Sequence, residues 1–178
     1  MSDASVYPEP SNTFKKSKRN ILSIIVDNEP GILARIVGLF SGRGYNIEAL
    51  NVTVVDVKEN LSRITLETIG EQKVIEQIIS HLEKLVPVHS AINLANLKES
   101  YEAEISLIKI IYVSEDQNLK TLALADIYRT RTVTKKEGIV IYEISGTSER
   151  VTKFSDDLNV IHGIKVELVR SGPIGLGV

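Results

Sequence analysis

An order of apolar segments that occurs twice is the feature that most constrains the fold of this 178-residue chain. The first copy begins with residues 21–26, a short apolar run rich in β-branched side chains, which is typical of a central β-strand. After a polar break, the next apolar residues are spaced to fill one face of a helix, and two glycines then predict its end. The helical residues are Ile32, Leu33, Ile36, Val37 and Phe40, and the glycines are Gly42 and Gly44.

The spacing of the apolar residues then changes from helical to strictly alternating. Residues 47–54 and 64–68 alternate apolar and polar side chains, which predicts two half-buried strands. Residues 75–82 again have helical spacing, Pro87 stops this second helix, and residues 88–94 indicate a last strand. The order of strand, helix, strand, strand, helix and strand is the ferredoxin-like arrangement. It predicts a four-stranded antiparallel sheet with both helices on one face.

The second half of the chain repeats this order. Residues 105–113 predict a strand, and strands at residues 132–134 and 139–144 flank a hairpin signal at residues 136–138. Two helices and a closing strand complete the copy. The apolar stripe of its first helix is predicted to be Leu119, Leu122, Ala123 and Ile127. The second helix and the closing strand have Val151, Phe154, Leu158, Ile164, Val166 and Leu168 as their apolar residues.

The two copies predict an α+β chain of two tandem ferredoxin-like (βαββαβ) domains. We expect the first domain at residues 20–95 and the second at residues 102–170, joined by a polar linker at residues 96–101. Residues 1–19 contain a cluster of lysine and arginine and are predicted to be a disordered basic tail. Residues 171–178 are rich in glycine and are predicted to be a flexible tail.

Composition and charge exclude several classes of function. The formal net charge of −2 provides no global basic field, so we expect no nucleic-acid partner and no membrane partner. The absence of cysteine excludes disulfides, thiolate nucleophiles and cysteine-based metal sites. No apolar run approaches the length that spans a bilayer, and the first twenty residues lack the apolar stretch of a signal peptide. We therefore expect a cytoplasmic protein.

The residues that could carry chemistry do not form a catalytic pattern. His81, His89 and His162 lie far apart, without the spacing of metal ligands. The sequence has no nucleophile motif, no phosphate-binding loop of the Walker type and no Gly-x-Gly-x-x-Gly after a strand. We therefore expect no catalytic residue, no metal site and no cofactor on this chain.

Residues 27–33 join the first predicted strand to the first predicted helix and form the best candidate for a binding site. Backbone N–H groups at a helix start are unpaired and carry partial positive charge, which suits a carboxylate. Gly31 allows a ligand close to the backbone, and the amide of Asn28 can both donate and accept hydrogen bonds. An ordinary turn explains the same residues. Asn46 is a common turn residue, or alternatively a polar contact to a ligand held between two protomers.

Three neighbouring segments, residues 28–36, 38–41 and 43–48, resemble the small subunit of acetolactate synthase, also called acetohydroxyacid synthase. They read Asn-Glu-Pro-Gly-Ile-Leu-Ala-Arg-Ile, Gly-Leu-Phe-Ser and Arg-Gly-Tyr-Asn-Ile-Glu. The resemblance continues through shorter segments and covers nearly the whole chain after the basic tail. These shorter segments are residues 62–65, 85–88, 144–147 and 169–172.

The resemblance implies that the first domain is an ACT domain, a ligand-binding module with the ferredoxin-like order. Two such domains would pair across a homodimer and bind valine, or in some members isoleucine or leucine, at their interface. The strand–helix loop would line this effector site, a second segment would contribute from the other side, and one position of the second strand would lie near it. The corresponding residues are Asn28, Gly31, Ile32 and Leu33 in the loop, Asn46 in the second segment and Thr53 in the strand.

The resemblance also implies a partner and a mode of action. The second domain would help to hold and activate a separate acetolactate synthase catalytic subunit, which carries thiamine diphosphate, magnesium and FAD. This chain would act allosterically, by raising activity on association and by feedback inhibition when the amino acid binds in branched-chain amino-acid biosynthesis.

Three other interpretations share this fold. A stand-alone ACT-domain amino-acid sensor would act on a different partner, and the sequence shows no helix-turn-helix as its output. An RNA-recognition module needs aromatic residues on the third strand, and residues 62–69 have none. An acylphosphatase-like enzyme needs an arginine in the first loop to hold phosphate, whereas residues 27–31 are acidic.

Overall fold

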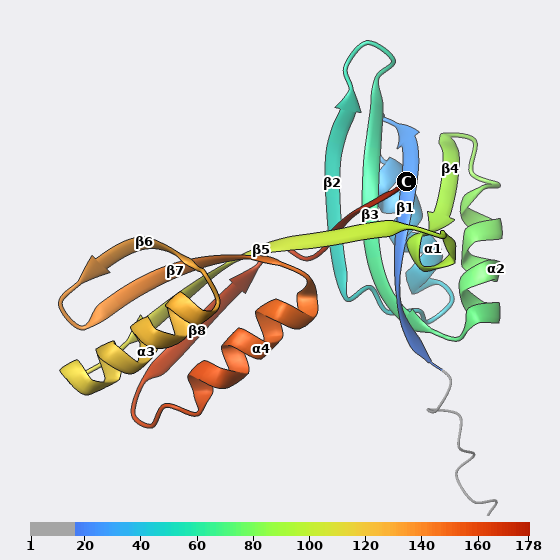
Figure 1. The fold of residues 1–178 in the computed structure, drawn as a ribbon. Coiled ribbons are helices and arrows are strands. Elements are labelled where there is room, and N and C mark those ends of the chain that lie inside the picture. Colours follow the sequence, from blue (N-terminus) through green and yellow to red (C-terminus); the bar gives the residue numbers. More distant parts are fainter. Residues whose placement is uncertain (1–16) are drawn as a thin grey trace, which may run out of the picture.

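The computed structural model describes residues 17–178, which form two sheets with their helices (Figure 1). The disordered tail predicted for residues 1–19 falls outside the described residues as far as residue 16. Its last two residues were assigned wrongly, because the first strand, β1 (Lys18–Asp27), already begins at Lys18. Lys18 and Arg19 pair with Gly70 and Ile69 of a neighbouring strand, so β1 extends beyond its apolar run.

The first domain has the predicted order of six elements. They are β1, α1 (Ile32–Ser41), β2 (Ala49–Asp56), β3 (Leu61–Gly70), α2 (Gln72–Leu82) and β4 (Val88–Asn93). The strands form one sheet in the order β2-β3-β1-β4, with every neighbouring pair antiparallel. The ferredoxin-like prediction for this half of the chain is therefore confirmed.

The core of the first domain lies between this sheet and its two helices. Alternate residues of β1 and β3 point to the helices, because successive side chains of a strand face opposite sides. Each helix supplies three buried residues at spacings of three or four, which puts them on one face. The buried residues are Leu22, Ile24, Val26, Ile64 and Leu66 from the strands and Ile32, Ile36, Phe40, Ile75, Ile78 and Leu82 from the helices.

The second domain repeats the arrangement. Its elements are β5 (Ser100–Ile111), α3 (Glu115–Ile127), β6 (Arg131–Lys136), β7 (Ile139–Gly146), α4 (Ser148–Asn159) and β8 (Lys165–Arg170). The strand order β6-β7-β5-β8 matches that of the first domain. Val151, Phe154 and Leu158 of α4 are fully buried against β5 and β7, as their spacing predicts. The prediction of two tandem ferredoxin-like domains is confirmed.

Helix α3 corrects the sequence analysis, because its predicted apolar stripe faces outward. Leu119 and Ile127 are 57% and 72% exposed, whereas Asn118, Thr121 and Ala125 are buried. Two donors of these side chains are satisfied within the helix: Asn118 Nδ2 donates to Glu115 Oε1 at 2.7 Å, and Thr121 Oγ1 donates to the Asn118 carbonyl at 2.9 Å. Among the described residues Asn118 Oδ1 accepts no hydrogen bond, so these bonds reduce the cost of turning short polar side chains to the sheet without removing it. Apolar spacing alone does not reveal this.

The linker and the C-terminal tail are more ordered than predicted. The linker at residues 96–101 overlaps a 3₁₀ turn, η2 (Leu94–Asn96), and the first residues of β5. The predicted flexible tail instead contains β9 (Ile174–Gly177), which pairs antiparallel with residues 100–103 of β5. Glycine permits this pairing where the tail approaches the first domain closely. The glycine content was therefore misread as flexibility.

The long strand β5 joins the two domains. Residues 100–103 pair with β9 over the first domain, and residues 104–111 pair with β7 and β8 in the second domain. Figure 1 shows β5 running from the first domain, where it follows η2, to the second domain, with the C-terminal segment returning beside it. The connection between the domains is therefore a hydrogen-bonded ribbon. Within residues 17–178, no helix has the length and apolar character needed to cross a membrane.

Candidate functional site

The turn between β1 and α1 is held by the β2–β3 hairpin. The backbone N–H of Asn28 donates to the carbonyl of Asn60 at 2.7 Å, and Asn60 Nδ2 donates to the carbonyl of Asn28 at 3.2 Å. Asn28 itself is exposed, and among the described residues its side chain makes no hydrogen bond. The turn is thus fixed through its backbone, which leaves the amide of Asn28 free at the surface.

The start of α1 has unused hydrogen-bond donors. Gly31 is its N-cap, with φ 88°, and no side chain caps the helix. The Gly31 carbonyl accepts from Arg35 N–H at 3.1 Å, but within residues 17–178 the N–H groups of Gly31, Leu33 and Ala34 have no acceptor. These donors and the helix dipole make this turn suited to an anionic group such as a carboxylate.

The loop residues predicted to line the ligand site differ in exposure. Leu33 is 37% exposed and can contact an apolar ligand group. Ile32 is only 7% exposed, because it lies on the same face of α1 as Ile36 and Phe40 and packs into the core. The side chain of Ile32 therefore faces the core, since residues at helical spacing share one face, and the place of Ile32 in the ligand site stays a prediction.

Asn46 lies at the opposite end of the first sheet. Its carbonyl accepts from Thr68 Oγ1 at 2.7 Å, and Thr68 is paired with Asn20 near the start of β1. Asn28 follows the other end of β1, so about 25 Å of strand separates Asn46 from the turn. Asn46 is exposed, and its Nδ2 donates to Glu48 Oε1 at 2.7 Å. A single chain therefore does not bring Asn46 to the turn.

Thr53 lies closer to the turn than Asn46 does. It is exposed on β2 and is level with Arg63 of β3 and Ile25 of β1, near the end of β1 that leads into Asn28. Two strand spacings, about 10 Å, separate it from β1. In one chain Thr53 thus flanks the turn across the sheet without contacting it.

The strand that carries Thr53 is an edge of the first sheet. Among the described residues β2 pairs only with β3, which leaves its outer edge open. Val52 and Val54 are each 49% exposed, and Val55 is similarly exposed. An edge strand with exposed apolar side chains is a template for pairing with another chain. This surface is therefore suited to a second protein chain.

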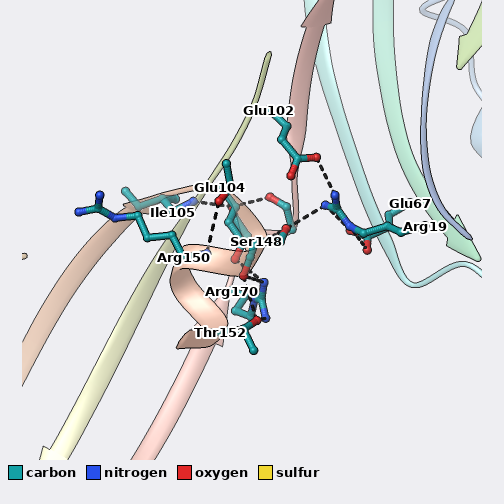
Figure 2. A network of polar contacts seen from close by, with 12 residues as sticks. Arg19, Glu67, Glu102, Glu104, Ile105, Ser148, Arg150, Thr152 and Arg170 are labelled. Atoms are coloured by element: carbon teal, nitrogen blue, oxygen red, sulfur yellow. Dashed lines mark hydrogen bonds and ion pairs between the residues drawn. The ribbon is translucent and has the colours of Figure 1, made fainter. Parts of the chain in front are cut away.

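A second polar cluster joins the two domains and was not predicted (Figure 2). Arg19 Nε lies 2.7 Å from Glu67 Oε1, and its Nη1 lies 2.7 Å from Glu102 Oε2. Its Nη2 donates to Ser148 Oγ at 2.9 Å. Burial lowers the pKa of Arg19, but the hydrogen bonds with Glu67 and Glu102 outweigh this and raise it above its usual value. Arg19 had been assigned to the basic tail.

Beside Arg19 lies a second charge pair and an open cleft. Arg170 Nη2 lies 2.5 Å from Glu104 Oε1, and Glu104 is buried. A cavity of about 700 Å³ opens beside this contact and is lined by Arg19, Glu67, Glu102, Ser148, Lys153 and Arg170, among others. The arginines here already hold carboxylates of this chain, so the cluster fastens the domains together rather than offering free charges.

Comparisons with known proteins match both domains separately. The family model described as the AHAS small subunit-like ACT domain matches residues 22–90. The model described as the small subunit of acetolactate synthase matches residues 103–178. Together the two matched ranges include the turn, β2 and the C-terminal strand, whereas Arg19 and Glu102 of the polar cluster lie outside them.

Whole-chain relatives agree with these matches. The acetolactate synthase small subunit of Haemophilus influenzae is 39% identical over 158 residues, covering 89% of this chain and 94% of the relative. The probable small subunit of Archaeoglobus fulgidus is 35% identical over 159 residues, covering 89% and 96%. The crystal structure of the small subunit from Thermotoga maritima has a TM-score of 0.76 at 27% identity, covering 90% of this chain and 98% of that chain.

Proposed function

The chain belongs to the family of acetolactate synthase small subunits, and from this premise we propose that it is the regulatory subunit of that enzyme. In this role it binds valine or a related branched-chain amino acid between two copies of its ACT domain. Because this amino acid is the end product of the pathway, its binding lowers the activity of a separate catalytic subunit when its concentration is high. The chain itself performs no chemical step.

The observation that carries this proposal is that the first domain has both an uncapped helix start and an open edge strand with exposed apolar side chains. β1 and β2 run in the same direction, because both pair antiparallel with β3. If β2 of a second copy pairs antiparallel with β2, the two sheets join across a two-fold axis. The Asn46 end of one copy then lies beside the Asn28 end of the other, so the dimer unites residues that one chain holds about 25 Å apart.

The residues at this junction match the chemistry of a branched-chain amino acid. The free N–H groups of Gly31 and Leu33 suit its carboxylate, and the amide oxygens of Asn28 and the partner's Asn46 suit its ammonium group. The exposed side chain of Leu33 offers an apolar contact to an aliphatic side chain. Thr53 lies on the paired strand beside this junction.

The partner follows from the family. A small subunit acts with a catalytic subunit, which we expect to carry thiamine diphosphate, magnesium and FAD. Within residues 17–178, no group of three histidine, aspartate or glutamate side chains is arranged to hold a metal ion. An amino acid bound to this chain can change the activity of the partner only if it binds one state of the assembly more tightly than the other.

Reconstitution with the catalytic subunit tests this proposal. Acetolactate formation is measured with the catalytic subunit alone, with the full chain added, and with valine titrated into the mixture. We expect activity to rise when the chain is added and to fall as valine is added. The Gly31→Asp variant places a carboxylate where the ligand carboxylate binds, so it should activate the partner and resist valine. Absence of activation by the wild-type chain would contradict the regulatory role.

A further inference from the structure

After β8 the chain turns back onto the first domain, and we name residues 171–178 the C-terminal strap. Ser171 fastens its first end to the second domain, since its N–H donates to the Ile105 carbonyl at 3.0 Å and its Oγ accepts from Ile105 N–H at 3.1 Å. The strap then leaves the second sheet and crosses to the first domain (Figure 1).

The strap meets the start of β2. Gly172 has φ 74°, and a Cβ built there would lie 2.8 Å from the Cβ of Ala49, so only glycine lets the backbone approach this closely. Asn51 Nδ2 donates to the carbonyl of Pro173 at 3.0 Å, and Pro173 is buried. This contact joins a residue of β2 directly to the segment that Ser171 anchors in the second domain.

Beyond Pro173 the strap is held against the first domain as β9. It pairs with residues 100–103 of β5, and a Cβ at Gly175 would overlap Leu94 and approach Ile21 of β1. The strap is therefore fixed at both ends. Between these ends its contact with β2 is narrow, because a cavity of about 440 Å³ lies beside it, lined by residues that include Leu50, Glu67 and Glu104.

Asn51, which holds the strap, lies on the same strand and the same face as Thr53. Asn51 and Thr53 are two residues apart on one strand, so their side chains share a face of the sheet. Val52 lies between them and points to the other face. The strand that would pair across the dimer and flank the effector thus also carries the donor that holds the strap.

We propose that the C-terminal strap relays the effector signal from β2 to the second domain. This inference rests on the proposed function. Binding of the amino acid at the paired β2 strands shifts Asn51, and the carbonyl of Pro173 follows through its hydrogen bond. The shift passes to Ser171 and β5, and so to the second domain and the catalytic subunit that it contacts. The Arg19 cluster is a separate contact between the domains, and the proposed path does not pass through it.

The proposed relay predicts how variants of the strap should behave. A change in the strap should leave the affinity for the amino acid and the activation of the catalytic subunit intact, and should weaken only the link between them. Coupling between two sites typically changes affinity between about fivefold and 150-fold. Loss of the Asn51 hydrogen bond should therefore raise the valine concentration for half-inhibition at least about fivefold.

The test uses the full-length chain assembled with its catalytic subunit. The variants are Asn51→Ala, which removes the donor, and a chain that ends at Ser171, which removes the rest of the strap. Asn96→Ala is the matched control, because Asn96 is exposed in η2 and takes no part in the strap contact. Valine binding to each chain is measured by calorimetry, and valine inhibition is measured on each assembled enzyme.

We expect both strap variants to bind valine like the wild type, to activate the catalytic subunit, and to resist inhibition, while Asn96→Ala behaves as wild type. Inhibition of both strap variants at the wild-type valine concentration would overturn the relay. Loss of valine binding in Asn51→Ala would also overturn it, by making Asn51 part of the binding site. A wild-type chain that neither binds valine nor is inhibited would instead refute the proposed function, and the relay with it.

Discussion

The two domains share a fold but differ at the start of their first helices. In the first domain, Gly31 caps α1 without a side chain, and the N–H groups of Leu33 and Ala34 have no acceptor among the described residues. In the second domain, Ser114 caps α3 in a capping box: Ser114 Oγ accepts from Gln117 N–H at 3.3 Å, and Gln117 Oε1 accepts from Ser114 N–H at 3.2 Å. The second domain thus caps its helix with its own side chains, whereas the first domain does not.

The edge strands differ in the same sense. β2 exposes Val52 and Val54, whereas β6 exposes Arg131, Lys135 and Lys136. Charged side chains, and lysine above all, protect an edge strand from pairing with another chain. Arg131 also forms an ion pair with Glu143, which lowers the pKa of that carboxyl. The comparison teaches that the first copy of the fold leaves its helix start and its edge strand unprotected, whereas the second copy caps its helix and carries charged side chains on its edge strand.

The largest effect should come from the cores, which test whether the domains are separate units. Phe40 and Phe154 are both fully buried, one in each domain. Phe40→Ala and Phe154→Ala should each lower the free energy of unfolding of their own domain by about 3–5 kcal/mol, through lost burial and a cavity. Denaturant unfolding followed by amide exchange would show which domain is weakened. If either variant lowered the stability of both domains equally, the two domains would unfold as one cooperative unit and not as separate units.

The next effect concerns the edge strands. Val52→Lys places a charge in the proposed β2 interface and should weaken dimerisation at least about tenfold, because an unpaired buried ammonium group is costly. Val133→Lys is the matched control on β6 and should leave the dimer unchanged. Sedimentation over a range of concentrations measures both. If only the β6 variant shifted the dimer equilibrium, the dimer would form through β6 and not through β2.

A smaller effect concerns the capped helix. Ser114→Ala removes the side-chain cap of α3 and should lower the free energy of unfolding of the second domain by about 1 kcal/mol. Valine affinity should not change, because the proposed effector site lies in the first domain. Thermal unfolding and calorimetry report the two quantities. A loss of valine affinity in this variant would mean that the second domain also binds the effector.

The smallest effect is the titration of Tyr128 in the second domain. The Tyr128 hydroxyl donates to Asp157 Oδ2 at 2.5 Å, and this hydrogen bond raises the pKa of Tyr128 to about 12. The folded state thus favours the protonated phenol, so its stabilising effect holds below about pH 10 and is lost as the pH rises to about 12. The difference between the tyrosinate absorbance of the wild type and Tyr128→Phe should have its midpoint near pH 12. A midpoint near pH 10 would show that the hydrogen bond is absent in solution.

Much of the fold could be predicted because apolar spacing and burial agree along most elements. The faces of α2 and α4 and the alternation in β3 follow directly from the sequence. Helix α3 could not be predicted in this way, because Asn118 and Thr121 face the sheet with their donors hydrogen-bonded inside the helix. Strand β9 could not be predicted because its glycines serve close packing between segments far apart in the chain.

The candidate site could be predicted only in part. The chemistry of the turn at Asn28 and Gly31 is local, so helix-start rules and the family resemblance both find it. The burial of Ile32 depends on which face of α1 meets the sheet, and the distance of Asn46 depends on strand direction. Arg19 was missed because its partners Glu67, Glu102 and Ser148 lie 48 to 129 residues away in the sequence.

The most direct test of the account is calorimetric titration of the full chain with valine, with serine as the control ligand. We predict saturable binding of valine that disappears in Asn28→Ala and persists in Asn159→Ala, a matched change at an exposed residue of α4. Wild-type affinity in the Asn28 variant, or a wild-type chain that binds valine no better than serine, would contradict the claim that the uncapped turn of the first domain is the effector site.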